Sequence, residues 1–247
     1  MEVHQHTHTP RKKWTHYFWE FFMLFLAVFY GFLAENEREH LVEHQREKRY
    51  MRSMVEDLML DTAEFNQKFI FINRMAPVFR AATELLYNQQ FSDTIIRKMY
   101  MTVPHCSVFF SLSVQDRTMS QLKSSGNLRL IRNKTITDSL ATYWNGLDLL
   151  NNVVIPAYDI TRIEVKNISF SLFNFDYYKD NIPFFSLLND NVSPKLLSSD
   201  KREFIKLANF ISYIRWQSNV PIRQRIMNAR RQATDLILVI RKNYHIK

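Results

Sequence analysis

One long apolar run constrains this chain more than any other feature. Residues 18–34 read FWEFFMLFLAVFYGFLA, and Glu20 is the single charged residue among them. Extended back to Trp14, the run would form a helix of about 31 Å, close to the roughly 30 Å hydrocarbon core of a bilayer. Trp14, Tyr17 and Trp19 gather at one end, as in aromatic belts. The run predicts a transmembrane helix over residues 14–34; a buried core helix is the alternative.

The charges beside this run indicate its orientation. Residues 11–13 read RKK, whereas residues 35–39 read ENERE. Cytoplasmic flanks of membrane spans carry an excess of Lys and Arg, so we expect a cytoplasmic N-terminus and an extracytoplasmic main domain. Phe32 stands where signal peptidase requires a small residue, which predicts an uncleaved signal anchor.

One side of the span carries small and polar residues. Glu20, Ala27 and Gly31 recur at helical spacing, away from the phenylalanines that line another side. Ala27 and Gly31 would let a second helix approach closely, and Glu20 would gain a polar partner. We expect this face to contact another transmembrane helix; the alternative is that small residues are simply common in spans. Glutamates four residues apart just beyond the span favour a hetero-partner over a homodimer.

The rest of the chain reads as helical. Only 3 of 247 residues are glycine, which argues against a turn-rich β fold. Residues 35–49 are polar and rich in helix formers, and an apolar stripe begins at Tyr50. The predicted fold class is therefore all-α. It comprises a basic tail over residues 1–13, a single transmembrane helix over 14–34, a stalk over 35–49 and an elongated helical bundle over 50–247.

Prolines and one glycine predict where the first helices of this bundle end. The helix that begins the bundle is expected to stop near Met75, before Pro77, and two shorter helices are expected over 78–89 and 93–101. Residues 102–116 read as loop or extended chain. Gly126 is expected to end a short helix in a left-handed conformation.

The second half predicts longer helices. Apolar residues recur at helical spacing from Ile136 past Pro156, which predicts one long, kinked helix. The β-branched residues of 160–170 leave a strand as the alternative, and 174–199 read as a long loop. Asp200 or Ser199 is expected to cap the next helix, and Pro221 to begin the last one. Each of these two helices is expected to bury an apolar stripe, which begins at Phe204 in the first and at Ile222 in the second.

Several segments taken in order resemble a known family. They are the basic tail, EFFMLFLAVFYGFLAENEREH, REKRYMRSMVEDLMLD and QLKSSGNLRLIRN. Their order is similar to that of a family of uncharacterised single-pass inner-membrane proteins of Gram-negative bacteria, known only as a domain of unknown function. The resemblance covers roughly residues 1–65 and 117–135. It implies an inner-membrane protein with a helical extramembrane domain, and it implies no activity, cofactor or site residues.

Histidines supply candidate metal ligands or pH-sensitive groups. His40 and His44 share a helix face with Glu37 and Glu47, and His residues four apart can bind one zinc ion together with a carboxylate. A solvated, salt-bridged face is the favoured interpretation of so polar a segment. The alternating histidines within residues 4–8 are likewise interpreted as a polar tail.

Acidic and thiol groups provide no clear catalytic site. Asp57, Asp61 and Glu64 share a face, and although paired carboxylates can act as acid and base, we expect a solvent-facing charged stripe. Cys106 is the single cysteine, which excludes an internal disulfide, and we expect a buried apolar group. The glycines are too far apart for a phosphate loop or a nucleophile elbow. We infer no enzymatic activity, cofactor or metal.

Positive charge is concentrated near the C-terminus. The net charge is +9, and residues 195–247 hold 12 Lys and Arg against 3 acidic residues. Four arginines predict a basic face on the last helix; they are Arg223, Arg225, Arg230 and Arg231. Such a face suits anionic lipid headgroups or an acidic protein, and an ordinary solvated basic face is the alternative. A domain outside the cytoplasm would not meet nucleic acid, so no nucleic-acid partner is expected.

Function follows from these expectations by exclusion. Some 13 residues ahead of the span are too few to fold, so a self-contained receptor is not expected. The expected function is a membrane-anchored structural or accessory interaction protein, a subunit of a larger membrane complex. The alternative is an envelope sensor of pH, metal or ligand that signals through a partner protein, with His40 and His44 as its trigger.

Overall fold

The structure, a computed structural model, describes residues 14–88, 90–178 and 193–246. Apart from isolated β-bridges, one of them between Phe173 and Leu196, the regular structure of these residues is helical. The predicted all-α fold class is therefore confirmed, and the alternative of a strand over 160–170 is excluded, because those residues lie within a helix. The chain divides into two compact units, residues 1–50 and 51–247.

The first unit is helical wherever it is described. Helix α1 runs from Trp14 to Asn88, and its residues 14–50 belong to this unit. Its most apolar 18-residue window is not buried at all, whereas a core helix is mostly buried, so the finding favours a membrane span. α1 is the one helix in the described ranges that is long and apolar enough to cross a membrane. Farther along, the Arg38 guanidinium donates to both carboxylate oxygens of Glu35, at 2.9 and 2.6 Å.

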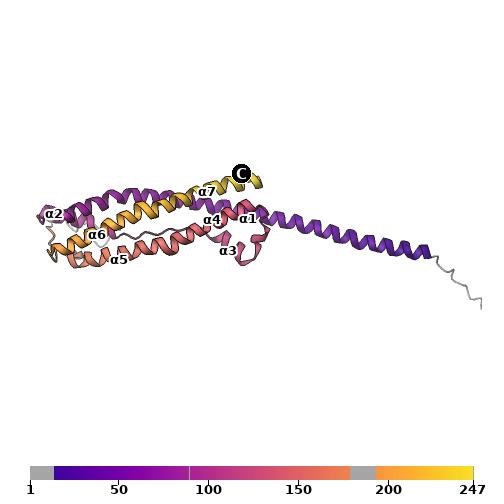
Figure 1. Cartoon of the computed structure of the whole chain (residues 1–247), viewed down its shortest axis with the longest axis horizontal. Helices are drawn as coiled ribbons and strands as arrows, with labels where there is room; N and C mark the ends of the chain where they lie inside the picture. Colours follow the sequence, from indigo (N-terminus) through magenta and orange to yellow (C-terminus); the bar gives the residue numbers. More distant parts are fainter. Residues whose placement is uncertain (1–13, 89, 179–192, 247) are drawn as a thin grey trace, which may run out of the picture. The chain divides into compact units, whose positions relative to one another are not determined.

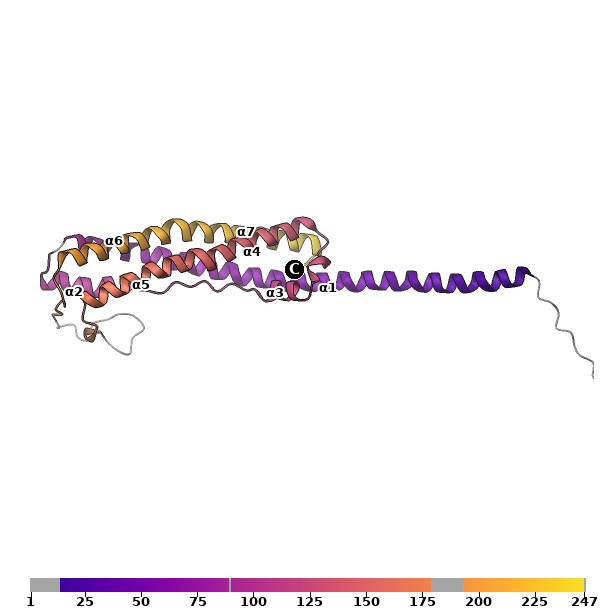
Figure 2. The ribbon, with the colours of Figure 1, turned by 60° about the horizontal axis from the view of Figure 1, so that its bottom comes forward.

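The second unit is a bundle of three helical rods (Figures 1 and 2). Its elements after α1 are α2 (Asp93–Thr102), η1 (Val103–Ser107), α3 (Arg117–Ser124), η2 (Asn127–Leu130), α4 (Lys134–Leu149), η3 (Leu150–Val154), α5 (Ile155–Leu172), η4 (Phe175–Tyr177), α6 (Lys201–Gln217), η5 (Ser218–Ile222) and α7 (Arg223–Tyr244). The rods are residues 51–88 of α1, the continuous run α4–η3–α5, and the run α6–η5–α7. α4 packs on α7, and α5 packs on α6.

The core forms where helical spacing brings apolar side chains onto one face. Met51, Met54 and Leu58 begin the stripe of α1, and each is fully buried. The stripes that the sequence predicts for the last rod are buried as well; they are Phe204, Leu207, Ala208, Ile211 and Ile214 on α6, then Ile222, Ile226, Ala229, Ala233, Leu236 and Ile240. Burial of such side chains is the main stabilising contribution in a bundle of this kind.

Pro77 does not end the first helix, and this expectation from the sequence is wrong. An internal proline removes one backbone hydrogen bond and its ring crowds the preceding turn. Met75 and Phe79, on either side of Pro77, are buried at 8% and 2% exposure. Their packing holds both adjoining turns against the core, so α1 continues through the proline to Asn88.

Two other prolines lie next to or within π-helical turns. Pro156 lies in the first turn of α5, two residues after η3 ends, and η5 contains Pro221. Pro221 therefore does not begin the last helix, as the sequence had predicted. A π turn widens the helix locally and makes room where a proline disrupts the hydrogen-bond ladder. The two turns contact each other across neighbouring rods, where Gln217 Nε2 donates to the Ala157 carbonyl at 3.3 Å.

The predicted helix caps are present. Gly126 follows α3 with a φ of 66°, in the left-handed region that favours glycine. The Asp200 carboxylate accepts from the Arg202 backbone N–H and caps α6. Within the predicted loop over 174–199, the described ends include the buried Tyr178, whereas residues 179–192 and the predicted tail over 1–13 lie outside the described residues.

Candidate functional site

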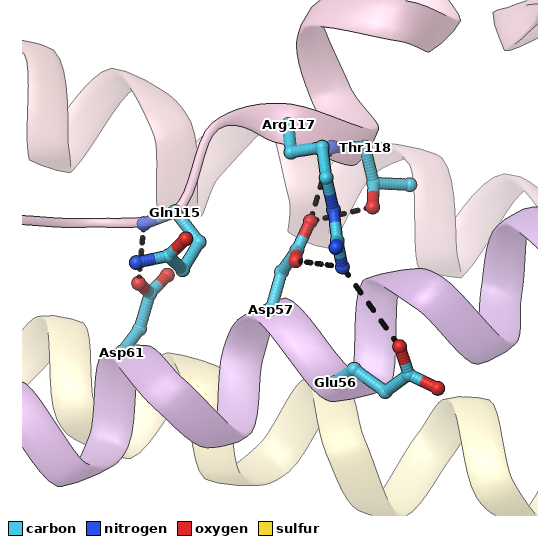
Figure 3. Close-up of polar contacts among 6 residues, drawn as sticks. All are labelled: Glu56, Asp57, Asp61, Gln115, Arg117 and Thr118. Atoms are coloured by element: carbon cyan, nitrogen blue, oxygen red, sulfur yellow. Dashed lines mark hydrogen bonds and ion pairs between the residues drawn. The ribbon is translucent and has the colours of Figure 1, made fainter.

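An extended segment lies along the bundle without a strand to pair with. Residues 108–116 connect η1 to α3 in non-helical conformation, and no strand partner for them occurs in the described part of the chain. Buried backbone N–H groups need acceptors, which a sheet would normally supply. The acceptors here come instead from carboxylate side chains of α1 (Figure 3).

Three carboxylates of α1 accept hydrogen bonds from the backbone of this segment and of the first turn of α3. The pairs, each from a backbone nitrogen to a carboxylate oxygen, are Ser113 to Glu64 at 3.2 Å, Gln115 to Asp61 at 2.7 Å and Thr118 to Asp57 at 3.0 Å. α1 and the extended segment run in opposite directions, so successive turns of α1 meet successive backbone donors of the segment. We call Asp57, Asp61 and Glu64 with these three amides the carboxylate ladder.

Asp57 is the most heavily bonded member of the ladder. Besides the Thr118 amide, it accepts from the Thr118 hydroxyl and, at 2.7 Å, from the Arg117 guanidinium. Asp57 is 2% exposed, whereas the Arg117 side chain is 65% exposed and also lies 3.8 Å from Glu56. Figure 3 shows Asp57 pointing from α1 toward the start of α3. The carboxylate is thus desolvated but fully supplied with donors.

Asp61 has neutral donors in place of a cation. Its second oxygen accepts from the Tyr143 hydroxyl of α4 at 2.7 Å. Burial is the main cause that raises the pKa of Asp61 to about 6, and the hydrogen bonds from Tyr143 and Gln115 lower it only in part. The nearby charges of Asp57 and Glu64 raise it further. Burial and the charge of Asp61 in turn raise the pKa of Tyr143.

The ladder corrects one expectation from the sequence. The acidic face was expected to be a solvent-facing stripe, but Asp57 and Asp61 are 2% and 1% exposed. Glu64 is partly exposed and pairs with Lys68 at 3.2 Å. A dissolved substrate does not reach the two buried carboxylates, so the arrangement holds the extended segment against α1 and is not a cleft for acid–base chemistry.

The sequence shows that these acids share one helix face, but it does not show that the face is buried. Carboxylates are rarely buried unless paired, so an acidic helix face reads as solvent-exposed by default. The donors follow 49 to 61 residues later in a segment without periodicity. Arg117, Thr118 and Tyr143 are the partners that sequence reasoning missed, because nothing in their local spacing points to α1.

Cys106 is buried, as expected. It is 0% exposed, and burial raises the pKa of its thiol. The thiol lies 3.8 Å from the Thr102 carbonyl one turn earlier. It therefore remains protonated at neutral pH and behaves as a small apolar group.

The proposed packing face of the span lies on an exposed helix. A Cβ added at Gly31 would meet no atom within 4 Å, and Ala27 is exposed one turn earlier. Glu20 lies 3.3 Å from His16 on the preceding turn. The face is sterically open in this structure, and its partner helix stays a prediction.

The stalk histidines do not assemble a metal site within the described residues. His44 Nδ1 lies 3.4 Å from Glu47 Oε2, and His44 is exposed whereas Glu47 is 2% exposed. His40 is exposed one turn earlier. In the described ranges no three His, Cys, Asp or Glu side chains gather as metal ligands would. The histidines within residues 4–8 lie outside those ranges.

The four arginines of α7 are spread around the helix. At 100° per residue, Arg223 and Arg230 lie on one flank of the buried stripe, Arg225 on the other flank, and Arg231 on the outer side. Arg223 donates to the Asn73 side chain of α1 at 2.8 Å. Arg230 and Arg231 are exposed. The structure therefore brings no more than part of this group onto any one surface.

Comparison of the chain with protein-family models, with curated proteins and with solved structures gave no match.

Proposed function

We propose that this chain is a membrane-anchored structural or accessory protein, a subunit of a larger complex in the bacterial inner membrane. The observation that supports this most is the exposed apolar surface of residues 14–34. The most apolar 18-residue window of α1 is 0% buried. A helix with such a surface is stable when lipid or other membrane helices surround it.

The chemistry of the second unit fits an interaction role. Asp57, Asp61 and the cysteine are buried in its packing, and its exposed surface includes large apolar side chains at several helices. We therefore propose contacts with other proteins, through the open face at Glu20, Ala27 and Gly31 within the membrane and through the bundle outside it. Anionic lipid headgroups are a further proposed partner for the arginines of α7.

We expect Gly31→Leu to weaken association of the span with its partner helix at least about tenfold, because close helix approach in lipid depends on small residues. The added side chain meets no atom of this chain, so insertion and folding are expected to persist. The measurement is cross-linking in intact membranes followed by mass spectrometry. Leu33→Phe, an enlargement of an exposed side chain on the opposite side of the helix, is the control and should retain every partner.

Glu20→Leu is expected to lose the same partner through the polar contact. If the unaltered chain gives no cross-link from this helix, or if both Glu20→Leu and Gly31→Leu keep every partner, the face is exposed to lipid and the proposal loses its main support.

We further propose that the N-terminus is cytoplasmic and the bundle periplasmic, on the strength of the basic flank over 11–13 and the acidic flank over 35–39. A reporter enzyme that folds only outside the cytoplasm, fused after Lys247, is expected to be active. Activity of a reporter restricted to the cytoplasm at the same position would reverse the orientation.

A further inference from the structure

α6 carries exposed aromatic side chains on the side opposite its buried face. Tyr213 and Trp216 are each 51% exposed, and Ile205 is 39% exposed. The rings of Tyr213 and Trp216 stack, with centroids 5.6 Å apart and planes inclined by 13°. Tyr and Trp are enriched where protein partners bind most strongly, because they bring a large contact area at a small entropic cost.

The outward side of α6 has the spacing of a coiled-coil seam. Residues along it are separated by four, three, four and three positions; they are Arg202, Lys206, Asn209, Tyr213 and Trp216, which we call the outer seam. A second helix packs along positions with this spacing. A surface hollow of about 520 Å³ lies along the seam from Arg202 to Tyr213. The Tyr87 hydroxyl of α1 donates to Asn209 at 2.7 Å and holds the middle of the seam in place.

The charge of the seam selects the chemistry of a partner. Arg202 and Lys206 are exposed and form no ion pair with any residue that the structure describes. Residues 195–247 hold 12 cationic against 3 acidic side chains, so a second copy would bring two basic surfaces together. An acidic partner would gain from the same charges through attraction on approach and pairing in the complex.

We propose that the outer seam binds an acidic amphipathic helix of another protein, with Tyr213 and Trp216 in apolar contact and Arg202 and Lys206 facing its carboxylates. This proposal rests on the proposed function in one respect, namely that the chain has a protein partner. A helix of this kind is a recurring mode of recognition, and its anchors repeat every three or four residues.

A protein helix suits the outer seam better than a lipid surface does. The cations and the aromatic pair are separated along α6, over about 21 Å from Arg202 to Trp216. A helix that lies in a membrane interface instead presents one continuous apolar face along its whole length. Lipid binding is accordingly an outcome that the experiment must be able to report.

The experiment uses the full chain in native membranes, with a photoreactive aromatic amino acid at Ile205, beside the seam. Leu238 on α7, which is 62% exposed, carries the same amino acid as the control position. Mass spectrometry then identifies the cross-linked molecule. We expect a protein segment with an acidic excess at helical spacing from position 205, and none of that segment from position 238.

The charge requirement is tested by a pair of double variants. Arg202→Glu with Lys206→Glu is expected to lower the cross-link at least about tenfold, because attraction becomes repulsion. Arg231→Glu with Lys242→Glu makes the same change of charge on α7 and should leave the yield within about twofold, since these positions lie off the seam. All of these side chains are exposed, so folding is expected to persist, which circular dichroism checks.

Four outcomes overturn the proposal. They are a cross-link to lipid, a cross-link to a second copy, a cross-link to a protein segment without acidic excess, and no cross-link at all. Cross-links from the transmembrane face at Gly31 separate the two proposals: if these persist while Ile205 gives none, the outer seam fails alone, and if both are absent the proposed function fails with it.

Discussion

Asp57→Ala is expected to destabilise the second unit by about 3 kcal/mol, because two buried hydrogen-bond donors would be left without an acceptor. The Thr118 amide and hydroxyl, on a residue that is 1% exposed, would lose their acceptor. The Arg117 guanidinium would lose less, because it is mostly exposed and water can replace the carboxylate. The measurement is the free energy of unfolding by urea, with the full chain in a neutral detergent.

Glu56→Ala is the matched control for this change. Glu56 is the neighbouring residue, lies 3.8 Å from the same guanidinium and is 61% exposed. An exposed ion pair contributes little, so the variant is expected to stay within about 0.5 kcal/mol of the unaltered protein. Amide hydrogen exchange at Thr118 should accelerate in Asp57→Ala and not in Glu56→Ala. Equal effects of the two substitutions would show that the carboxylate ladder contributes nothing beyond surface charge.

Asp61 is expected to make stability fall as pH rises from about 4 to 7. The folded pKa of about 6 lies above the ordinary value of 3.8, so the folded chain holds this proton more tightly than the unfolded chain does. The stabilisation is fully present below pH 3.8 and is lost as pH rises through 6. At about 1.4 kcal/mol per pKa unit, the largest loss of unfolding free energy that this shift can cause is about 3 kcal/mol. We expect about 2 kcal/mol, because the surroundings relax around a charge.

Asp61→Asn isolates this contribution, because the amide does not titrate. The difference in unfolding free energy between the variant and the unaltered chain should shift by about 2 kcal/mol, in favour of the variant, between pH 4 and pH 7.5. Taking this difference cancels the titration of the groups that do not interact with Asp61. Parallel profiles for the two proteins would contradict the assignment.

Tyr143→Phe is a second, independent test of the pKa of Asp61. The hydroxyl of Tyr143 donates to Asp61 and lowers its pKa, so its removal should move the titration of Asp61 to higher pH. The carboxyl carbon of Asp61, followed by NMR, reports this shift directly.

The sequence by itself determined the helices and the faces that they bury. The stripe beginning at Met51 and the stripes of α6 and α7 follow from helical period and side-chain apolarity alone, and the structure buries them as predicted. Gly126 and Asp200 fixed helix ends through left-handed backbone and side-chain capping, which are also local effects. The exposed apolar run over 14–34 is likewise a property of the sequence, since its composition needs no partner to be recognised.

Only the tertiary structure decided what became of residues whose local preference conflicts with packing. Pro77 and Pro221 disfavour helix locally, yet the core on either side of Pro77 and the π turn around Pro221 keep both rods continuous. Asp57 and Asp61 favour water, yet an extended segment some 54 to 61 residues farther along brings the donors that make their burial possible. Local sequence carries propensity and period, whereas the environment of a polar side chain depends on distant segments that no local pattern encodes.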